Sequence, residues 1–206
     1  MNVDVALGCA AAACFAAVLA LGAFVQRAPL TALDRAGLRL RGNGTRAAIV
    51  FTRSGYWPAL VALNVALFVG LLPSGRVPLP AFVLAGTQLV AQGAAEALKS
   101  FFRRARPDDW LFHREFGHAF PSGHAATAAA FYGGLLLVVW TTPLPRAIRL
   151  VLTVVLAVWI VGIPWSRMAL AAHYGTDVLG GLLLGAGWLC LMAALLRQLP
   201  PVHVFG

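Results

Sequence analysis

Six long apolar stretches constrain this 206-residue chain more than any other feature of its sequence. A helix needs about 20 mostly apolar residues to cross a bilayer, and each stretch approaches that length. The chain is 60% hydrophobic and 11% charged, whereas soluble domains carry roughly 25% charged residues. We therefore predict an all-α integral membrane bundle of six transmembrane helices, at Val3–Val25, Trp57–Leu72, Leu79–Leu98, Gly123–Trp140, Ile148–Trp165 and Thr176–Leu196.

The organisation of the chain favours one membrane-embedded domain over residues 1–206, because no internal repeat is visible and most connections are short. A cleaved signal peptide is disfavoured, since Met1–Asp4 carries no basic residue and the following apolar run exceeds the roughly 7–15 residues of a signal core. The cysteines lie inside predicted spans, so we expect free, buried thiols at Cys9, Cys14 and Cys190.

The connection Gln26–Tyr56 contains an amphipathic pattern. One helical face carries Leu30, Leu33, Gly37 and Leu40, and the opposite face carries Arg35 and Arg39. An ordinary solvated loop is one interpretation. The other is a helix at the lipid surface with its arginines on anionic headgroups, and we favour it. The sequence therefore predicts an interfacial helix between the first and second spans.

The connection Lys99–Pro121 holds five basic residues, three acidic residues and two histidines. Ionisable groups at membrane depth are expensive, so such a cluster is a functional hypothesis, with solvated loop charge as the alternative. A metal site could be imagined from His113, His118, Asp108, Asp109 and Glu115, but these residues lack a recognised ligand spacing. We predict that the protein binds no metal and no cofactor.

Three separated patterns favour the functional interpretation. Lys99 is followed after six residues by Arg106-Pro107, then comes Pro121-Ser122-Gly123-His124, and then Ser166-Arg167, five residues, His173, three residues and Asp177. In this order they resemble the three signature motifs of the type 2 phosphatidic acid phosphatase family, which also contains the vanadium haloperoxidases. The motifs run from Lys99 to Asp177, and the six-span layout extends the resemblance over the whole chain.

The chemistry of these residues suits a transferring phosphoryl group, whose equatorial oxygens carry concentrated negative charge. Cationic side chains neutralise that charge, and an arginine fork can bind two oxygens. A serine can cap the start of the fourth span, and the following glycine lets a ligand approach a helix N-terminus that favours anions. We predict a phosphate cradle made of Lys99, Arg106, Ser122, Gly123 and Arg167. Glu96, one turn before Lys99, is expected to position that lysine.

The catalytic prediction concerns two histidines and a carboxylate. His173 and Asp177 are four residues apart, so on a helix they share one face and the carboxylate could accept a ring N–H; a helix-capping pair is the alternative. The resemblance implies that His173 attacks phosphorus to form a phosphohistidine and that Asp177 orients it. It also implies that His124 protonates the leaving oxygen and later activates water.

These features are compatible with three functions. The first, which we favour, is a membrane lipid phosphatase, and the others are a lipid-linked phosphotransferase and a non-enzymatic lipid phosphate binder or transporter. Against the binder stand the two histidines, because gripping phosphate needs cations but no titrating pair. The resemblance suggests undecaprenyl pyrophosphate as substrate, with phosphatidylglycerol phosphate and phosphatidic acid as alternatives. The expected partners are the lipid phosphate and membrane lipids, with no nucleic acid; the oligomeric state is not predicted.

Two criteria disagree about orientation. The side with the motifs carries twelve of the sixteen basic residues and the other side carries Arg76, Arg146, Arg149 and Arg197, so the positive-inside rule favours a cytoplasmic site. Family members usually face outward. We predict a site facing the periplasm of a bacterial inner membrane, because the arginines of Gln26–Tyr56 can serve lipid binding instead.

Overall fold

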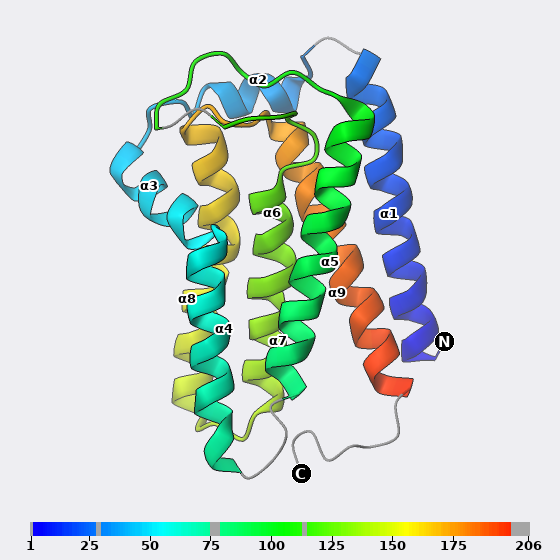
Figure 1. Cartoon of the computed structure of the whole chain (residues 1–206), viewed down its shortest axis with the longest axis vertical. Coiled ribbons are helices and arrows are strands. Elements are labelled where there is room, and N and C mark those ends of the chain that lie inside the picture. Colours follow the sequence, from blue (N-terminus) through cyan, green and yellow to red (C-terminus); the bar gives the residue numbers. More distant parts are fainter. Residues whose placement is uncertain (1, 28–29, 75–78, 113–114, 199–206) are drawn as a thin grey trace.

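The protein is a bundle of helices standing side by side, with a shorter layer of helix and loop across one end (Figure 1). The computed structural model describes residues 2–27, 30–74, 79–112 and 115–198. The bundle contains α1 (Val3–Arg27), α4 (Trp57–Leu71), α5 (Leu79–Phe102), α6 (Gly123–Thr127), η2 (Ala128–Tyr132), α7 (Gly133–Thr141), α8 (Arg146–Ala169) and α9 (Gly175–Gln198). The remaining elements are α2 (Ala32–Leu38), α3 (Thr45–Ser54) and η1 (Leu72–Ser74). These ranges contain no β-strand, so the all-α prediction is confirmed.

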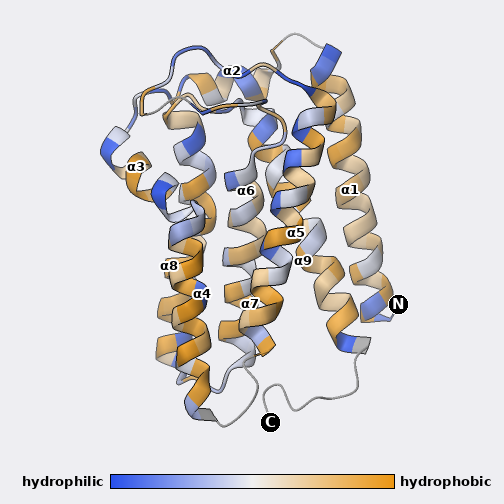
Figure 2. Cartoon of the chain, in the orientation of Figure 1, coloured by the Kyte–Doolittle hydropathy of each residue, from blue (hydrophilic) through white to orange (hydrophobic). Residues whose placement is uncertain are grey.

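Four helical segments in the described ranges are long and apolar enough to cross a membrane, namely α1, Gly123–Thr141, α8 and Gly175–Arg197. A fifth arises if α3 and α4, which meet at 57°, count as one span. The first, fourth, fifth and sixth predicted spans are thus matched. Helix α5 does not pass the same criterion, since it carries Gln88, Gln92, Glu96 and Lys99. Apolar residues nevertheless dominate the flanks of the bundle, and hydrophilic ones gather near α2 and α3 (Figure 2).

Helix α9 packs against α6 and η2 through two glycines. A Cβ added at Gly181 would lie 2.8 Å from the Cβ of Ala125, and one added at Gly185 would lie 2.8 Å from the Cβ of Ala129. Small residues four apart allow such close approach of helix backbones in membranes. The contact brings the start of α6 beside the start of α9, where the Ser122 N–H donates to the Asp177 carbonyl at 2.9 Å.

The fourth span is not the regular helix that the apolar run predicted. Between α6 and α7 the chain makes a π-helical turn, η2, with one more residue per turn than the α-helix. Relative to an uninterrupted α-helix, the added residue rotates the segment beyond it by about 100° around the helix axis. Two hydrogen bonds join this region to its neighbours: Gln88 of α5 donates to Thr127 Oγ1 at 2.7 Å, and the Tyr132 hydroxyl donates to the Ser54 carbonyl of α3 at 2.8 Å.

The amphipathic segment after α1 forms α2, which lies across the end of the bundle (Figure 1). The helix ends at Leu38, so it does not extend to Leu40. On α2, Leu33 of the predicted apolar face is 44% exposed, whereas Asp34 is fully buried. The reason is specific pairing: Thr31 and Asp34 form a capping box, and the Asp34 carboxylate has further partners in the bundle.

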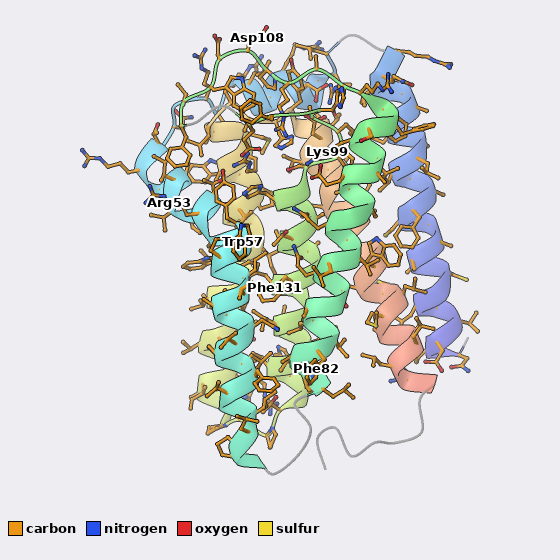
Figure 3. The ribbon with its side chains drawn as sticks, in the orientation of Figure 1. Arg53, Trp57, Phe82, Lys99, Asp108 and Phe131 are labelled. Carbon is orange, nitrogen blue, oxygen red and sulfur yellow. The ribbon has the colours of Figure 1, made fainter. Side chains whose placement is uncertain are left out.

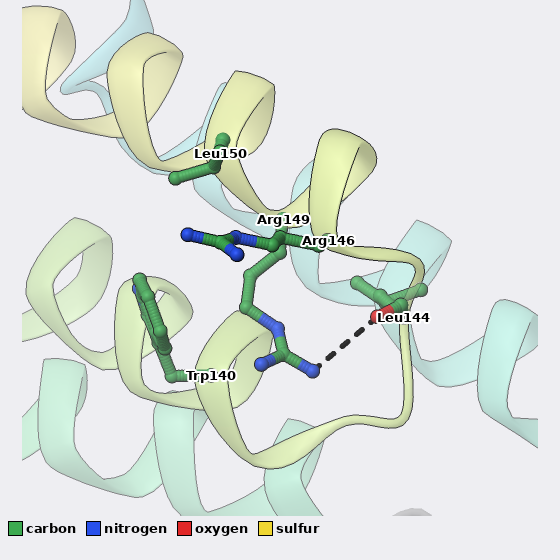
Figure 4. Close-up of a pocket in the computed structure, with 5 residues that line it drawn as sticks. All are labelled: Trp140, Leu144, Arg146, Arg149 and Leu150. Carbon is green, nitrogen blue, oxygen red and sulfur yellow. Dashed lines mark hydrogen bonds between the residues drawn. The ribbon is translucent and has the colours of Figure 1, made fainter.

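The opposite end of the bundle contains a cavity of about 430 Å³ between the end of α7 and the start of α8 (Figure 4). Its lining residues are Trp140, Leu144, Arg146, Arg149 and Leu150. None of them belongs to the three motifs. The cysteines are free, as predicted, but Cys9 is exposed and Cys14 and Cys190 are half-buried, so the expected burial is wrong.

Candidate active site

The three motifs meet at the end of the bundle that α2 covers. Lys99 lies in the last turn of α5, as Figure 3 shows, and Arg106 follows in the connection to α6. The second motif caps and begins α6, and Arg167 lies in the last turn of α8. The connection to α9 carries His173, and the first turn of α9 carries Asp177. Residues up to 78 positions apart in sequence therefore share one site.

Arg106 contacts the predicted nucleophile directly. Its Nη1 lies 3.0 Å from His173 Nε2 and also donates to the Ala172 carbonyl at 3.0 Å, while Nε donates to the Gly117 carbonyl at 3.2 Å. The side chain is 6% exposed. An arginine can only donate, so His173 Nε2 is the acceptor and a neutral ring carries its proton on Nδ1, the atom that faces Asp177.

His173 is buried at the site, with 1% of its side chain exposed. It lies in the turn before α9, not on the helix that the four-residue spacing suggested. Burial, together with the positive charges of Arg106 and Arg167, lowers the pKa of His173 well below its ordinary value. The imidazole is therefore neutral near pH 7, which is the form that can attack phosphorus.

Asp177 is fully buried beside His173, and its Oδ2 lies 3.6 Å from His173 Nδ1. That distance exceeds a hydrogen bond, so the pair is adjacent but not bonded in this structure. Oδ2 accepts the Tyr174 N–H at 2.8 Å, and Oδ1 accepts Arg104 Nη1 at 2.5 Å. Arg104 is not among the residues predicted for the site. Its only signal was a position two residues before Arg106, within the first motif.

Arg167 is almost completely buried and makes two side-chain hydrogen bonds, to Thr52 and to Glu115. Glu115 also pairs with Arg106 at 3.3 Å and accepts the Tyr56 hydroxyl at 3.2 Å. A carboxylate thus bridges the two arginines that we assigned to phosphate. In the sequence, Glu115 stood out only as one of the loop residues without a recognised metal-ligand spacing.

Burial raises the pKa of Glu115, but the charges of Arg167 and Arg106 and the hydrogen bond from Arg167 outweigh it and hold that pKa at about 2. Glu115 is therefore an anion at every physiological pH. Its position between two cationic side chains is evidence that this place in the protein stabilises negative charge.

The second motif begins α6 as predicted. Ser122 is the N-cap, and its side chain accepts the Ala125 N–H at 3.4 Å. The space next to Gly123 holds the amide of Gln92, since an added Cβ would lie 3.1 Å from it. Lys99 donates to Glu96 at 2.6 Å, which confirms the predicted pairing.

His124 lies in the first turn of α6 with 9% exposure. The ring of Tyr56 packs edge-to-face against it at 4.7 Å between centroids. In the described part of the chain, His124 Nε2 is a buried nitrogen without a hydrogen-bond partner. His124 also interacts electrostatically with Arg167, His173 and Lys99, so the second motif belongs to the same charged cluster.

No metal-binding group of three or more His, Cys, Asp or Glu side chains occurs among the residues described. His113 lies outside them, as does His203. Metal independence remains a prediction for experiment.

The family model of the PAP2 superfamily matches residues 80–200, more than half of the chain. The chain belongs to the PAP2 superfamily. The matched PAP2 region contains every residue that we predicted for the site, from Lys99 to Asp177. The family resemblance of the three motifs is confirmed.

Curated PAP2 relatives are similar over part of their length. The chain is 35% identical over 111 residues to a lipid A 1-phosphatase of Rhizobium etli, covering 49% of this chain and 43% of the relative. It is 34% identical over 91 residues to phosphatidylglycerophosphatase B of Bacillus subtilis, covering 44% of this chain and 45% of the relative. The alignments thus span less than half of the relatives' length.

The PAP2 fold is supported over nearly the whole chain. The crystal structure of a transmembrane PAP2-type phosphatidylglycerolphosphate phosphatase from Bacillus subtilis matches with a TM-score of 0.77 at 22% identity. The match covers 98% of this chain and 100% of the other. The protein is therefore an all-helical membrane protein with this fold.

Proposed function

We propose that this protein is a membrane lipid phosphatase that works through a phosphohistidine at His173. The observation that carries the proposal is the contact of 3.0 Å between Arg106 Nη1 and His173 Nε2. It places a cation able to bind a phosphoryl oxygen beside a buried, neutral imidazole. The family and the phosphatase names of the relatives give independent support.

The reaction begins when the substrate phosphate replaces the Glu115 carboxylate between Arg106 and Arg167. Lys99 and the N–H groups at the start of α6, next to Ser122 and Gly123, complete the phosphate cradle. His173 Nε2 attacks phosphorus, and the bond from phosphorus to the lipid oxygen breaks. Protonated His124 gives its proton to that oxygen.

The second step returns the enzyme to its starting state. Neutral His124 removes a proton from water, the hydroxide attacks the phosphohistidine, and the bond from phosphorus to His173 breaks. Asp177 faces the Nδ1–H of His173, and its negative charge stabilises the positive charge that the ring carries in both steps. The cradle arginines stabilise the charge on the phosphoryl oxygens, so the chemistry requires no metal.

The preferred substrate of this proposal is undecaprenyl pyrophosphate, followed by phosphatidylglycerol phosphate and phosphatidic acid. Because relatives are named lipid A 1-phosphatase and phosphatidylglycerophosphatase B, lipid A belongs in the comparison. Phosphate release by detergent-purified protein should be measured for all four lipids. Phosphate that appears on an added acceptor lipid would indicate a phosphotransferase, and binding of every lipid without turnover would indicate a binder.

Metal independence and vanadate inhibition test the cradle. Activity should survive excess chelator, and vanadate should inhibit because it mimics five-coordinate phosphorus. Loss of activity in chelator, restored by a divalent ion with a monophosphate lipid, would overturn the assignment of Arg106 and Arg167.

We also propose that residues 1–206 form one domain with six membrane crossings, α4 and α5 being the second and third, and with α2 at the lipid surface. Both helices stand alongside the four segments that qualify as spans (Figure 1). The polar side chains of α5 include Gln88, which is buried in the bundle. A helix can carry such residues through a membrane when they face other helices.

The site is proposed to face the periplasm of a bacterial inner membrane. In a variant with its three cysteines replaced by alanine, Asp108→Cys should react with an impermeant thiol reagent in intact spheroplasts. Arg146→Cys at the opposite end should react only after lysis. The reverse pattern would put the site in the cytoplasm.

A further inference from the structure

Asp34, on α2, is a carboxylate that is fully buried against the start of α9. Its Oδ1 accepts the N–H of Thr176 at 3.0 Å and the hydroxyl of Thr176 at 2.6 Å. Its Oδ2 accepts the Thr31 N–H at 3.0 Å and Arg104 Nη2 at 2.9 Å. A buried charge is tolerated only with such partners, so Asp34 is held in one place by two other elements of the fold.

Arg104 joins Asp34 to the predicted catalytic pair. Nη2 bonds Asp34, while Nη1 bonds Asp177 Oδ1 at 2.5 Å and Thr176 Oγ1 at 2.6 Å. The guanidinium is 4.6 Å from the centre of the Tyr174 ring, and its side chain is 8% exposed. A planar arginine fork with two carboxylates and a ring around it has little freedom to turn.

The balance of charge in this network bears on His173. Arg104 divides its positive charge between Asp34 and Asp177. If Asp34 were neutral, Arg104 would act on Asp177 alone, and the negative charge of Asp177 would stabilise positive charge on the His173 ring less well. The imidazole would then be less basic and a poorer nucleophile.

We propose that Asp34 is a positioning residue that acts through Arg104 to hold Asp177, and thereby His173, ready for phosphoryl transfer. The inference rests on the proposed function, in which His173 is the nucleophile. It gives α2 a role in the reaction, besides any contact with lipid. A purely structural role, in which Asp34 only caps α2 and anchors it, is the competing explanation.

Several other charged groups act on His173 and must remain unchanged in the test. They are Lys99, Arg106 and Glu115 from α5 and the connection after it, Arg167 from α8, and His124 from α6. Within the described residues, Arg104 is the cationic side chain that hydrogen-bonds Asp177. Substitution of Asp34 therefore changes the charge that acts on His173 and Asp177 through Arg104, and it leaves these other groups in place.

The test variant is Asp34→Asn, which keeps the shape of the side chain and removes its charge. The rate of phosphoenzyme formation per active site should fall by roughly 10- to 100-fold, a loss typical of partners that orient a reacting imidazole in metal sites. KM should change little, because Asp34 does not touch the cradle. The acidic limb of the kcat/KM profile should move to lower pH, since a less basic His173 loses its proton at lower pH.

Two controls separate positioning from folding. Asp109→Asn removes a carboxylate at the same end, where it pairs with Arg41 at 2.6 Å in an exposed salt bridge, and should change neither rate nor profile. Thr31→Ala removes the α2 cap but retains Asp34. It should lower stability by about 1 kcal/mol, the usual cost of a lost cap, with the rate per site unchanged.

The double variant Asp34→Asn with Arg104→Gln tests whether Asp34 acts through Arg104. If Asp34 acts through Arg104, the double variant should be no slower than Arg104→Gln alone, whereas multiplying losses would overturn the proposal. It would also be overturned if Asp34→Asn reduced only the number of active sites, with rate and pH profile per site unchanged. Full activity in His173→Ala would instead refute the proposed function.

Discussion

At the α2 end of the bundle three arginine side chains, those of Arg104, Arg106 and Arg167, are buried among carboxylates, whereas the arginines described at the opposite end are half-buried or exposed. Arg167 has 1% of its side chain exposed and pairs with Glu115. Arg197, at the other end, is 55% exposed and pairs with Asp4 at 2.7 Å. Arg149 contacts the Trp140 ring at 5.4 Å and the Leu144 carbonyl at 3.3 Å (Figure 4).

The difference teaches where function should be sought in a chain of this kind. Exposed cations near the ends of membrane helices cost little and are found wherever lipid headgroups lie. Buried cations are expensive and persist only with anions at hand. The cavity near Trp140 contains two arginines, but its cations are half-buried or exposed and no predicted catalytic residue lies there. Burial, and not the presence of arginine, distinguishes the candidate active site.

The largest expected effect comes from the nucleophile. His173→Ala should abolish phosphoryl transfer from every substrate, because the covalent intermediate cannot form. Arg149→Gln is the control at the opposite end. Phosphate release should be measured for a lipid and for p-nitrophenyl phosphate, with size-exclusion profiles to check folding. Substantial turnover by His173→Ala would remove the functional distinction between the two ends.

His124→Ala should reduce turnover of a lipid substrate by roughly 10²–10⁴-fold, the usual contribution of a positioned proton donor. Formation of the phosphoenzyme from p-nitrophenyl phosphate should suffer far less, because nitrophenolate leaves without protonation. The two first-step rates can be compared by rapid quenching. Equal losses with both substrates would mean that His124 binds phosphate and does not move protons.

Glu115→Gln should lower KM by about threefold to tenfold, since tenfold corresponds to only about 1.4 kcal/mol. The neutral amide competes less strongly than a carboxylate for Arg106 and Arg167. An unchanged or higher KM would show that Glu115 does not occupy the place of the substrate phosphate.

The Glu115→Gln variant should also differ from the unaltered protein in how its melting temperature depends on pH. The pKa of Glu115 is lowered from 4.5 to about 2, so its ion pairs stabilise the fold fully above pH 4.5 and lose that effect as pH falls through about 2. The melting temperature of Glu115→Gln should therefore lie below that of the unaltered protein at neutral pH, and the gap should close towards pH 2. A gap independent of pH would contradict this ion-pair role.

The smallest effect is expected at the opposite end. Arg149→Gln removes a cation–π contact with Trp140, which is worth about 0.5–1 kcal/mol at exposed sites. Thermal unfolding should register this loss, and phosphate release should not change. A large loss of activity would show that the two ends are coupled.

The sequence was sufficient for features that depend on composition and local spacing. Apolar runs located four segments that qualify as spans, and motif spacing selected His173, Asp177 and the cradle residues that the fold brings to one end. The buried partners were not predictable in this way. Asp34 and Arg104 are 70 residues apart, and nothing local distinguishes them from solvated charges. The burial of Asp34 on α2 was not predictable for the same reason, since its pairing decides it and apolar periodicity does not.

Trapping of the covalent intermediate tests the central claim most directly. The protein should be mixed with a ³²P-labelled lipid phosphate, quenched within milliseconds in alkali and digested for mass spectrometry. We predict an acid-labile, alkali-stable label on His173 that is absent in His173→Ala and accumulates in His124→Ala. Normal turnover without a label, or a label on another residue, would contradict the account.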